Sequence, residues 1–309
     1  MLSFVVRRIL WLIPVLLVIS LITFFLMLSV PGNPFEGSGE VPLPPETVAR
    51  LRAHYGLDDP IFTQYLRYMQ NVVLRWDLGP SYAGARSVNE MVAGGFPISA
   101  TLGLLGLLVA LSIGIPLGIT SALNQNRAID HFAMFFAMAG VSVPAMTLAP
   151  LLIWVFALNL GWLPVARWGT WQQAVMPAII LGLGPAAGLA RLTRASMLQV
   201  IREDYIRTAR AKGVPERRIT IRHALKNALI PVITVLGPMF AGMVTGAVVI
   251  ERIFAIPGMG GYFVGGVSSR DYPVIMGMVL VYTFFLVLSN LAVDLAYAWV
   301  DPRIRLDQR

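Results

Sequence analysis

The sequence predicts an all-α membrane protein with six membrane-spanning helices. Hydrophobic residues make up 57% of the 309 residues and charged residues 13%, with a mean hydropathy of +0.71, which lies outside the usual range of a soluble domain. Six long uncharged runs each approach the roughly 20 residues of helix that a bilayer core about 30 Å thick requires. Cysteine is absent, which excludes disulfides, thiol catalysis and cysteine metal sites.

The expected spans follow one another along the chain. They are residues 9–30, 96–123, 132–159, 174–190, 228–250 and 272–293. The first run is too long for the apolar region of a signal peptide and lacks a small-residue cleavage pattern, so we expect it to be retained as an anchor. Prolines inside or beside several runs predict kinked helices packed in a bundle, because neighbouring helices can satisfy the carbonyls that proline frees.

Basic residues predict the orientation of the chain. Sixteen Lys and Arg residues fall in the termini and short loops of one side, whereas the short loops of the other side hold only Arg167, Arg252 and Arg270. Short cytoplasmic loops carry the excess of Lys and Arg in membrane proteins. Both termini and the segment 191–226 are therefore expected in the cytoplasm.

The long first external segment, residues 31–95, contains two stretches with helical periodicity. Residues 45–55 and 60–74 each begin with a proline, and apolar side chains then recur at helical spacing. We expect two short amphipathic helices. They either lie on the membrane surface or form a small lobe over a pore entrance, and the sequence leaves both alternatives open.

Residues 203–228 carry dense basic charge between apolar runs and predict a helix, turn, helix arm. The first helix begins at Glu203 and Asp204 and becomes basic toward its end, which suits the partial charges of a helix dipole. Gly213 predicts a left-handed cap and Pro215 makes continuation of the helix unfavourable. A second helix should start near Glu216 and run into the next span. A basic loop that only obeys the positive-inside rule would not need this Gly-x-Pro break.

The arm resembles the cytoplasmic "EAA" loop of binding-protein-dependent ABC importer permeases, in the variant "RTARAKG" of the peptide and nickel branch. The similarity covers nearly the whole chain and includes "VPGNPF", "YGLDDPIFTQY", "DLGPSY", "ERIFAIPGMGG", "RDYPV" and "DPRIR" in order. Within this family, the sequence resembles the B-type permease subunits of oligopeptide importers most. Arg207 stands where the general consensus has Glu, a departure that the peptide branch shares.

The resemblance implies a type I importer-like permease that forms half of a peptide translocation pathway in the inner membrane of a bacterial or archaeal cell. It implies that the 203–213 helix couples the chain to a separate ATPase subunit. The implied coupling residues are Arg207, Thr208, Ala209, Arg210, Lys212 and Gly213. The implied partners are a second permease subunit in a heterodimer, two ABC ATPase subunits, an extracytoplasmic peptide-binding protein and membrane lipids, with no nucleic acid.

The sequence lacks the residues that ATP hydrolysis would need. It has no G-x-x-x-x-G-K-[ST] pattern and no Gly-Lys pair, so the chain should not be an enzyme, and ATP and Mg²⁺ are expected only in the partner subunits. The three histidines are scattered without the spacing of metal ligands, so neither a metal site nor a cofactor is expected in this chain.

Two alternative functions remain open at this point. Dipeptides, glutathione or nickel chelates could replace oligopeptides within the same family. An ion-coupled secondary transporter is a more remote alternative, since such proteins carry ionisable residues at mid-membrane depth and only Asp294 lies clearly within a run. Arg191 and Arg194 are expected to snorkel to the membrane boundary.

The expected division of the chain is into an anchor at 1–30, an external segment at 31–95 and a five-helix permease core at 96–309, whose cytoplasmic coupling loop spans about 196–227.

Overall fold

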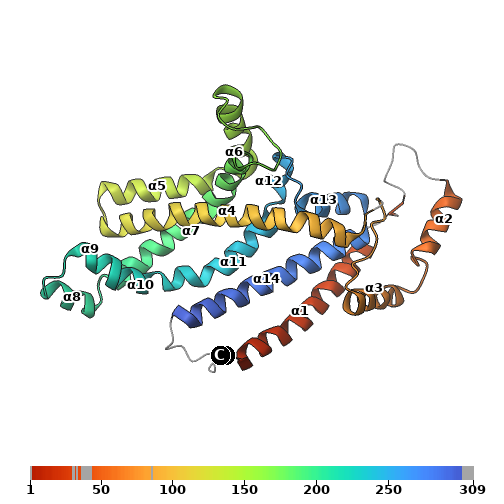
Figure 1. Ribbon diagram of the computed structural model, residues 1–309, viewed down its shortest axis with the longest axis horizontal. Coiled ribbons are helices and arrows are strands. Elements are labelled where there is room, and N and C mark those ends of the chain that lie inside the picture. Colours follow the sequence, from red (N-terminus) through yellow and green to blue (C-terminus); the bar gives the residue numbers. More distant parts are fainter. Residues whose placement is uncertain (1, 30–31, 33, 36–43, 85, 301–309) are drawn as a thin grey trace. The chain divides into compact units, whose positions relative to one another are not determined.

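The computed structural model in Figure 1 describes residues 2–29, 32, 34–35, 44–84 and 86–300, and these residues are predominantly helical. Within the described residues, extended pairing is confined to an isolated bridge between Pro80 and Ser87. The chain divides into two compact units, one of residues 1–99 with 257–287 and one of residues 100–256 with the chain from 288 onward. The division of the chain predicted from the sequence stays a prediction.

The first unit contains the anchor helix and the two short helices of the predicted external segment. Its elements are α1 (Leu2–Ser29), α2 (Pro45–His54), α3 (Ile61–Arg75), the start of α4 (Val88–Leu123), α13 (Met259–Ser269) and most of α14 (Tyr272–Val300). Pro44 and Pro60 precede α2 and α3 with extended backbone, so each helix begins where a proline blocks its extension. The two predicted amphipathic helices are confirmed to within one or two residues.

A buried carboxylate fixes the loop 77–87 in this unit. Asp271, between α13 and α14, accepts a hydrogen bond of 2.5 Å from the Ser81 hydroxyl and one of 3.1 Å from the Ala83 amide. The carboxylate also lies 3.4 Å from the Val274 amide at the start of α14. These neutral donors satisfy a carboxylate that burial would otherwise penalise.

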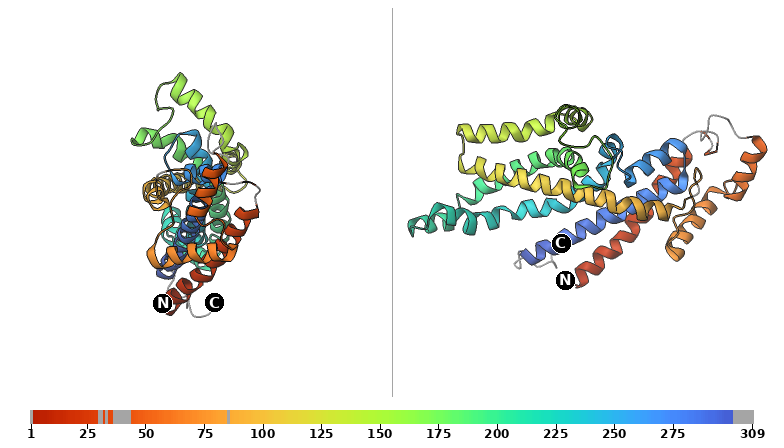
Figure 2. Two further views of the ribbon diagram at one scale, coloured as in Figure 1. Left: turned by 90° about the vertical axis from the view of Figure 1, so that its right-hand side faces the viewer. Right: turned by 45° about the horizontal axis from the view of Figure 1, so that its top comes forward.

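The second unit holds the remaining spans and the arm. After α4 come α5 (Ala128–Ser142), α6 (Ala145–Leu152), η1 (Ile153–Asn159), α7 (Trp171–Val200), α8 (Asp204–Ala211), α9 (Glu216–Arg218), η2 (Ile219–Ala224), α10 (Leu225–Ala228), α11 (Ile230–Gly246) and α12 (Val248–Ile253). Buried alanines, Ala137 on α5 and Ala187 and Ala190 on α7, let these two backbones approach closely. Figure 2 shows α8 and α9 at one end of the long helices of this unit.

Five helices of the described residues are long and apolar enough to cross a membrane. They are Val6–Ser29, Val88–Leu123, Trp171–Val200, Ile230–Ile253 and Tyr272–Val293. A sixth span exists if Ala128–Gly140 and Ala145–Asn159, bent by 95° at the break between them, cross as one. The predicted number of six therefore counts this bent pair once, and the cytoplasmic position of both termini stays a prediction.

The run expected at 132–159 is bent where α5 ends, in keeping with the kinks expected from its prolines. Val143 has extended backbone (φ −97°, ψ 117°) and Pro144 follows it as the N-cap of α6. Proline disfavours helical backbone in the preceding residue, so α5 ends there and the chain changes direction. The side chain of Asp294 and the closing segment 301–305 lie outside the described part of the chain, as do 30–31 and 33 around the "VPGNPF" stretch.

Candidate functional site

The first helix of the arm ends in the tight turn that the sequence predicts. Gly213 has φ +76°, and its amide donates a 2.9 Å hydrogen bond to the Arg210 carbonyl. The next amide, of Val214, reaches back to the Ala209 carbonyl at 3.2 Å. These two bonds form a Schellman cap, in which a glycine takes the left-handed position at little steric cost. The predicted positive φ of Gly213 is confirmed.

The returning half of the arm leads directly into α11. Pro215 is the N-cap of α9, which confirms the expected start near Glu216. The chain then widens into the π-helix η2 before α10 restores α-helical geometry. We use "the arm" below for residues 203–228. Its backbone is helical over most of its length, so it can act as one stiff projection from α7 and α11.

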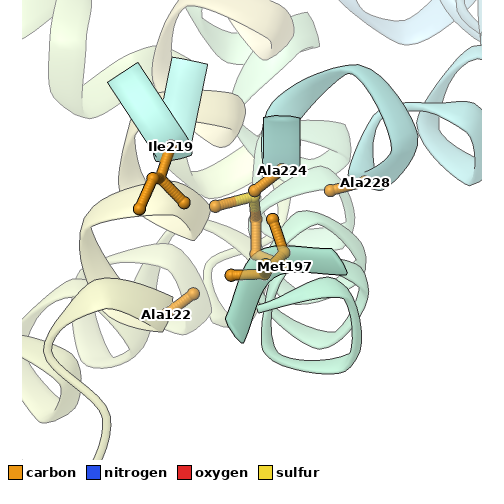
Figure 3. Close-up of a cluster of buried hydrophobic side chains, with 6 residues drawn as sticks. Ala122, Met197, Ile219, Ala224 and Ala228 are labelled. Atoms are coloured by element: carbon orange, nitrogen blue, oxygen red, sulfur yellow. The ribbon is translucent and has the colours of Figure 1, made fainter. Parts of the chain in front are cut away.

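An apolar plug attaches the arm to the ends of the long helices. Six side chains form it: Ala122 of α4, Met197 of α7, Ile206 of α8, Ile219 and Ala224 of η2, and Ala228 of α10. Figure 3 shows Met197 reaching between Ala122 on one side and the η2 residues on the other. Burying a side chain such as isoleucine contributes about 1.5–3 kcal/mol, so the plug holds the arm against the ends of α4 and α7.

Polar contacts join the two halves of the arm to one another. The Tyr205 hydroxyl on α8 accepts a 2.8 Å hydrogen bond from Asn227 Nδ2 and lies 3.4 Å from the carbonyl oxygen of His223. Arg210 donates to both carboxylate oxygens of Glu216, at 2.7 and 3.3 Å. The Arg210 guanidinium thereby lowers the pKa of the Glu216 carboxyl, and Glu216 raises the pKa of Arg210. Both side chains are exposed, so this ion pair contributes little to stability.

The outward side of the arm is charged and open. Of the six coupling residues implied by the resemblance, five are exposed: Arg207, Thr208, Arg210, Lys212 and Gly213. The sixth, Ala209, is partly buried and packs against the apolar plug. The structure therefore places five of the residues on the accessible surface and one beneath it.

A buried ion pair lies beside the plug, and the sequence prediction missed it. Asp130, at the start of α5, accepts hydrogen bonds of 2.8 Å from Arg194 Nε and 2.6 Å from Arg194 Nη2 on α7. It also accepts one from the Ser121 hydroxyl on α4 and one of 2.9 Å from the Asn126 amide. We call these four residues the latch. A bidentate pair with arginine satisfies a carboxylate that is rarely buried alone.

The latch gives Arg194 a carboxylate partner that the sequence did not predict. Asp130 and Arg194 are far apart in the sequence, so no helical or loop spacing connects them. One feature of the sequence could have indicated this pair. Asp130 stands at the start of an apolar run, where a carboxylate needs a partner. A second contact, from Arg202 Nη2 to Gln125 Oε1 at 3.2 Å, joins the same α4–α5 turn to the entrance of the arm.

Comparison with known proteins gives a consistent result over the full length. Residues 114–306 match the family described as binding-protein-dependent transport system inner membrane component, and residues 1–103 match the N-terminal family of such membrane components. The chain is 45% identical over 308 residues to the oligopeptide transport system permease protein OppB of Salmonella typhimurium, covering 99% of this chain and 100% of that protein.

Two relatives that are named for other substrates have a comparable sequence identity to this chain. The dipeptide transport system permease protein DppB of Bacillus subtilis is 46% identical over 298 residues, covering 95% of each chain. The glutathione transport system permease protein GsiC of Salmonella paratyphi A is 39% identical over 305 residues, covering 99% of each. Among solved structures, an inward-facing MetNI methionine ABC transporter shares the fold with a TM-score of 0.57 and 19% identity, covering 68% of this chain and 96% of that one.

Proposed function

This chain belongs to the family of binding-protein-dependent transport system inner membrane components, and on that premise we propose that it is the permease subunit of an ATP-driven peptide importer. It forms one half of the translocation pathway, and a second permease subunit supplies the other. Two ABC ATPase subunits provide the energy and an extracytoplasmic binding protein delivers the substrate. ATP and Mg²⁺ bind to the ATPase subunits, and this chain itself has no catalytic residue or cofactor.

Peptides are the proposed substrate because relatives that are 45% and 46% identical over nearly the whole chain carry oligopeptide and dipeptide transport in their names. Their identities of 45% and 46% do not separate the two peptide classes. Glutathione remains the alternative with a named relative, and nickel chelates remain one by resemblance alone. Uptake assays of the assembled complex with tri- to pentapeptides, dipeptides and glutathione in competition would rank these substrates directly.

The arm is the proposed contact with the ATPase subunit, and its construction is the observation that carries the proposal. Its outward face is charged, while its inward face ends in the plug that connects α4, α7 and α10. A displacement of α8 is therefore passed to the ends of the spans through close-packed side chains, which transmit strain rather than absorb it. When ATP closes the ATPase pair, the docked arm would tilt the helices from an inward-facing to an outward-facing arrangement.

Two glycines provide a matched test of this contact. Gly213 and Gly161 both have positive φ, +76° and +64°, and a Cβ atom at either would meet no other atom within 4 Å. Valine at either position therefore suffers a similar backbone penalty, on the order of 1 kcal/mol or more, and its Cβ atom meets no neighbouring segment. Only Gly213 lies in the arm.

We expect Gly213→Val to insert and express normally but to lower peptide uptake and substrate-stimulated ATP hydrolysis together, by about fivefold or more for a 1 kcal/mol change in the docked state. Gly161→Val should transport nearly as well as the wild type. Full coupling in Gly213→Val, or equal losses in both variants, would contradict the assignment of the arm. Uptake without any ATPase subunit would instead favour the ion-coupled alternative.

A further inference from the structure

A stripe of apolar side chains runs along the exposed side of α3. Phe62, Leu66 and Val73 are 66%, 50% and 63% exposed. With 3.6 residues per turn, these three side chains lie within about 40° of one another around the helix axis. Exposed polar residues, Thr63, Arg67 and Gln70, occupy the neighbouring face. Leu74, 69% exposed, lies among these polar residues, so α3 presents an apolar stripe beside a face of mixed polarity. The described residues provide no covering for the stripe.

The opposite face of α3 packs against the outer half of α1. Tyr65 is buried, its ring lies 5.4 Å from that of Phe24, and its hydroxyl lies 2.8 Å from the hydroxyl of Ser20. Ser20 precedes the helix end at Ser29 by a distance of about 13 Å along the axis, at 1.5 Å per residue. Figure 1 shows α3 beside α1 accordingly. Because α1 is a candidate membrane span over Val6–Ser29, this contact places Tyr65 of α3 beside a residue of that span.

Neighbouring residues of α1 at this level also need an apolar environment. Leu17 and Leu21 are 43% and 41% exposed, and at 3.6 residues per turn they lie within about 60° of Phe24, which packs with Tyr65. Lipid chains are the environment that a membrane span supplies to such side chains. The stripe on α3 lies beside this region and so borders the same lipid.

The end of α3 carries a residue typical of the membrane boundary. Trp76 is 81% exposed and caps the helix in the left-handed conformation, with φ 54°. Its amide donates to the Asn71 carbonyl, and its own carbonyl accepts a 2.6 Å hydrogen bond from Asn89 Nδ2. Left-handed backbone is unfavourable for a bulky residue and is retained here by contacts on both sides. Tryptophan is enriched where a bilayer meets water, and Arg75 beside it can place its charge among headgroups.

We propose that α3 is an interfacial helix whose stripe of Phe62, Leu66 and Val73 is immersed in the acyl chains of the leaflet that α1 reaches at Ser29. Membrane lipid is its partner, and the face of Thr63, Arg67 and Gln70 lies toward headgroups and water. The helix anchors the loop that follows it at a fixed depth. The proposal requires that α1 spans the membrane and does not depend on the substrate or on ATP-driven import.

The absence of native cysteine makes the depth of α3 directly measurable. Single-cysteine variants Leu66→Cys, Val73→Cys and Gln70→Cys would each be labelled with the fluorophore NBD in the assembled complex and placed in nanodiscs with lipids that carry a doxyl quencher on the acyl chain. Leu21→Cys, on the exposed side of α1, reports a site within the span. We expect the two stripe positions to be quenched like Leu21 and about threefold more strongly than Gln70, with blue-shifted emission.

Equal and weak quenching at Leu66, Val73 and Gln70, alongside strong quenching at Leu21, would overturn the proposal while leaving the span intact. A response at the stripe only after addition of the extracytoplasmic binding protein would assign the surface to a protein and also overturn it. Weak quenching at Leu21 would contradict the span itself, and the interfacial helix with it. A loss of peptide uptake in the unlabelled variants bears on the proposed transport function alone.

Discussion

The arm and α3 are built alike on their inner sides and differ on their outer sides. Each is a short helical segment outside the long spans, and each buries one face against the end of a span: Ile206 among the plug residues, Tyr65 against α1. The outer side of the arm is charged, whereas that of α3 carries the stripe of Phe62, Leu66 and Val73. The inner faces therefore explain how each segment is attached, and the outer faces differ as the proposals of a protein partner for the arm and of lipid for α3 require.

Each of the two units contains a buried carboxylate that holds a loop, and the two carboxylates have different kinds of partner. Asp130 in the second unit is held by the guanidinium of Arg194, whereas Asp271 in the first unit is held by hydroxyl and amide donors. A charged partner creates a large penalty when only one member is removed, because the other remains uncompensated. The penalty is smaller when the group that is removed was held by neutral donors.

The largest effect is expected for Asp130→Ala. This change leaves the partly exposed Arg194 guanidinium without its carboxylate, and the free energy of unfolding should fall by about 3 kcal/mol, near the low end for broken buried pairs. Thermal unfolding of the purified complex measures it. Asp204→Ala removes an exposed carboxylate from its pair with Arg207 and should change the midpoint very little. Equal shifts in the two variants would mean that the latch is not a stabilising pair.

A smaller effect is expected for Asp271→Ala. Loss of the Ser81 and Ala83 hydrogen bonds leaves these donors unsatisfied at a cost of about 2 kcal/mol. Hydrogen exchange of residues 77–87 should accelerate, while exchange in the arm stays unchanged. Asp271→Asn retains one acceptor oxygen and should restore much of the protection. Faster exchange across the whole chain would show that Asp271 supports more than this loop.

Truncation within the plug should have a still smaller effect. Ile206→Val removes one buried methyl group and should destabilise the arm by about 1 kcal/mol, whereas Ile221→Val does so on an exposed side chain and should be nearly neutral. Proteolysis of the arm under native conditions would compare the two variants. The same cleavage rate in both would contradict the distinction between the inner and outer faces.

The smallest effect is expected for the exposed pair of Arg210 and Glu216, at under about 1 kcal/mol. The pKa of Glu216 is lowered in the folded arm. The pair's contribution to the stability of the arm is therefore fully present at pH values above the ordinary pKa of glutamate. It is lost as the pH falls through the lowered pKa. The protection factor at the Gly213 turn, which compares the exchange rate with the intrinsic rate at the same pH, should therefore fall in acid, and Glu216→Gln should remove this pH dependence. An unchanged pH profile in Glu216→Gln would exclude the pair as its cause.

Local features of the fold were predictable from the sequence, whereas contacts between distant segments were not. The Gly-x-Pro break located the end of α8, and prolines located the starts of α2 and α3, because these residues restrict the backbone directly. Apolar runs located the spans for the same local reason, although α4 and α7 extend beyond the predicted limits.

The latch and the stripe depend on tertiary packing. Nothing local joins Asp130 to Arg194, so the sequence did not predict their ion pair. The contact of Tyr65 with Ser20, which joins α3 to α1, likewise lies between segments that no sequence spacing connects.

The most direct test of the central claim is the accessibility of Thr208, on the outer side of α8. A fluorophore on Thr208→Cys in the reconstituted permease pair should be quenched by a water-soluble quencher, and assembly with the ATPase subunits should protect it. A fluorophore on Gln70→Cys, which is also exposed and polar, should respond equally with and without the ATPase. Continued quenching at Thr208 in a complex that hydrolyses ATP and transports peptide would contradict the assignment of the arm as the docking surface.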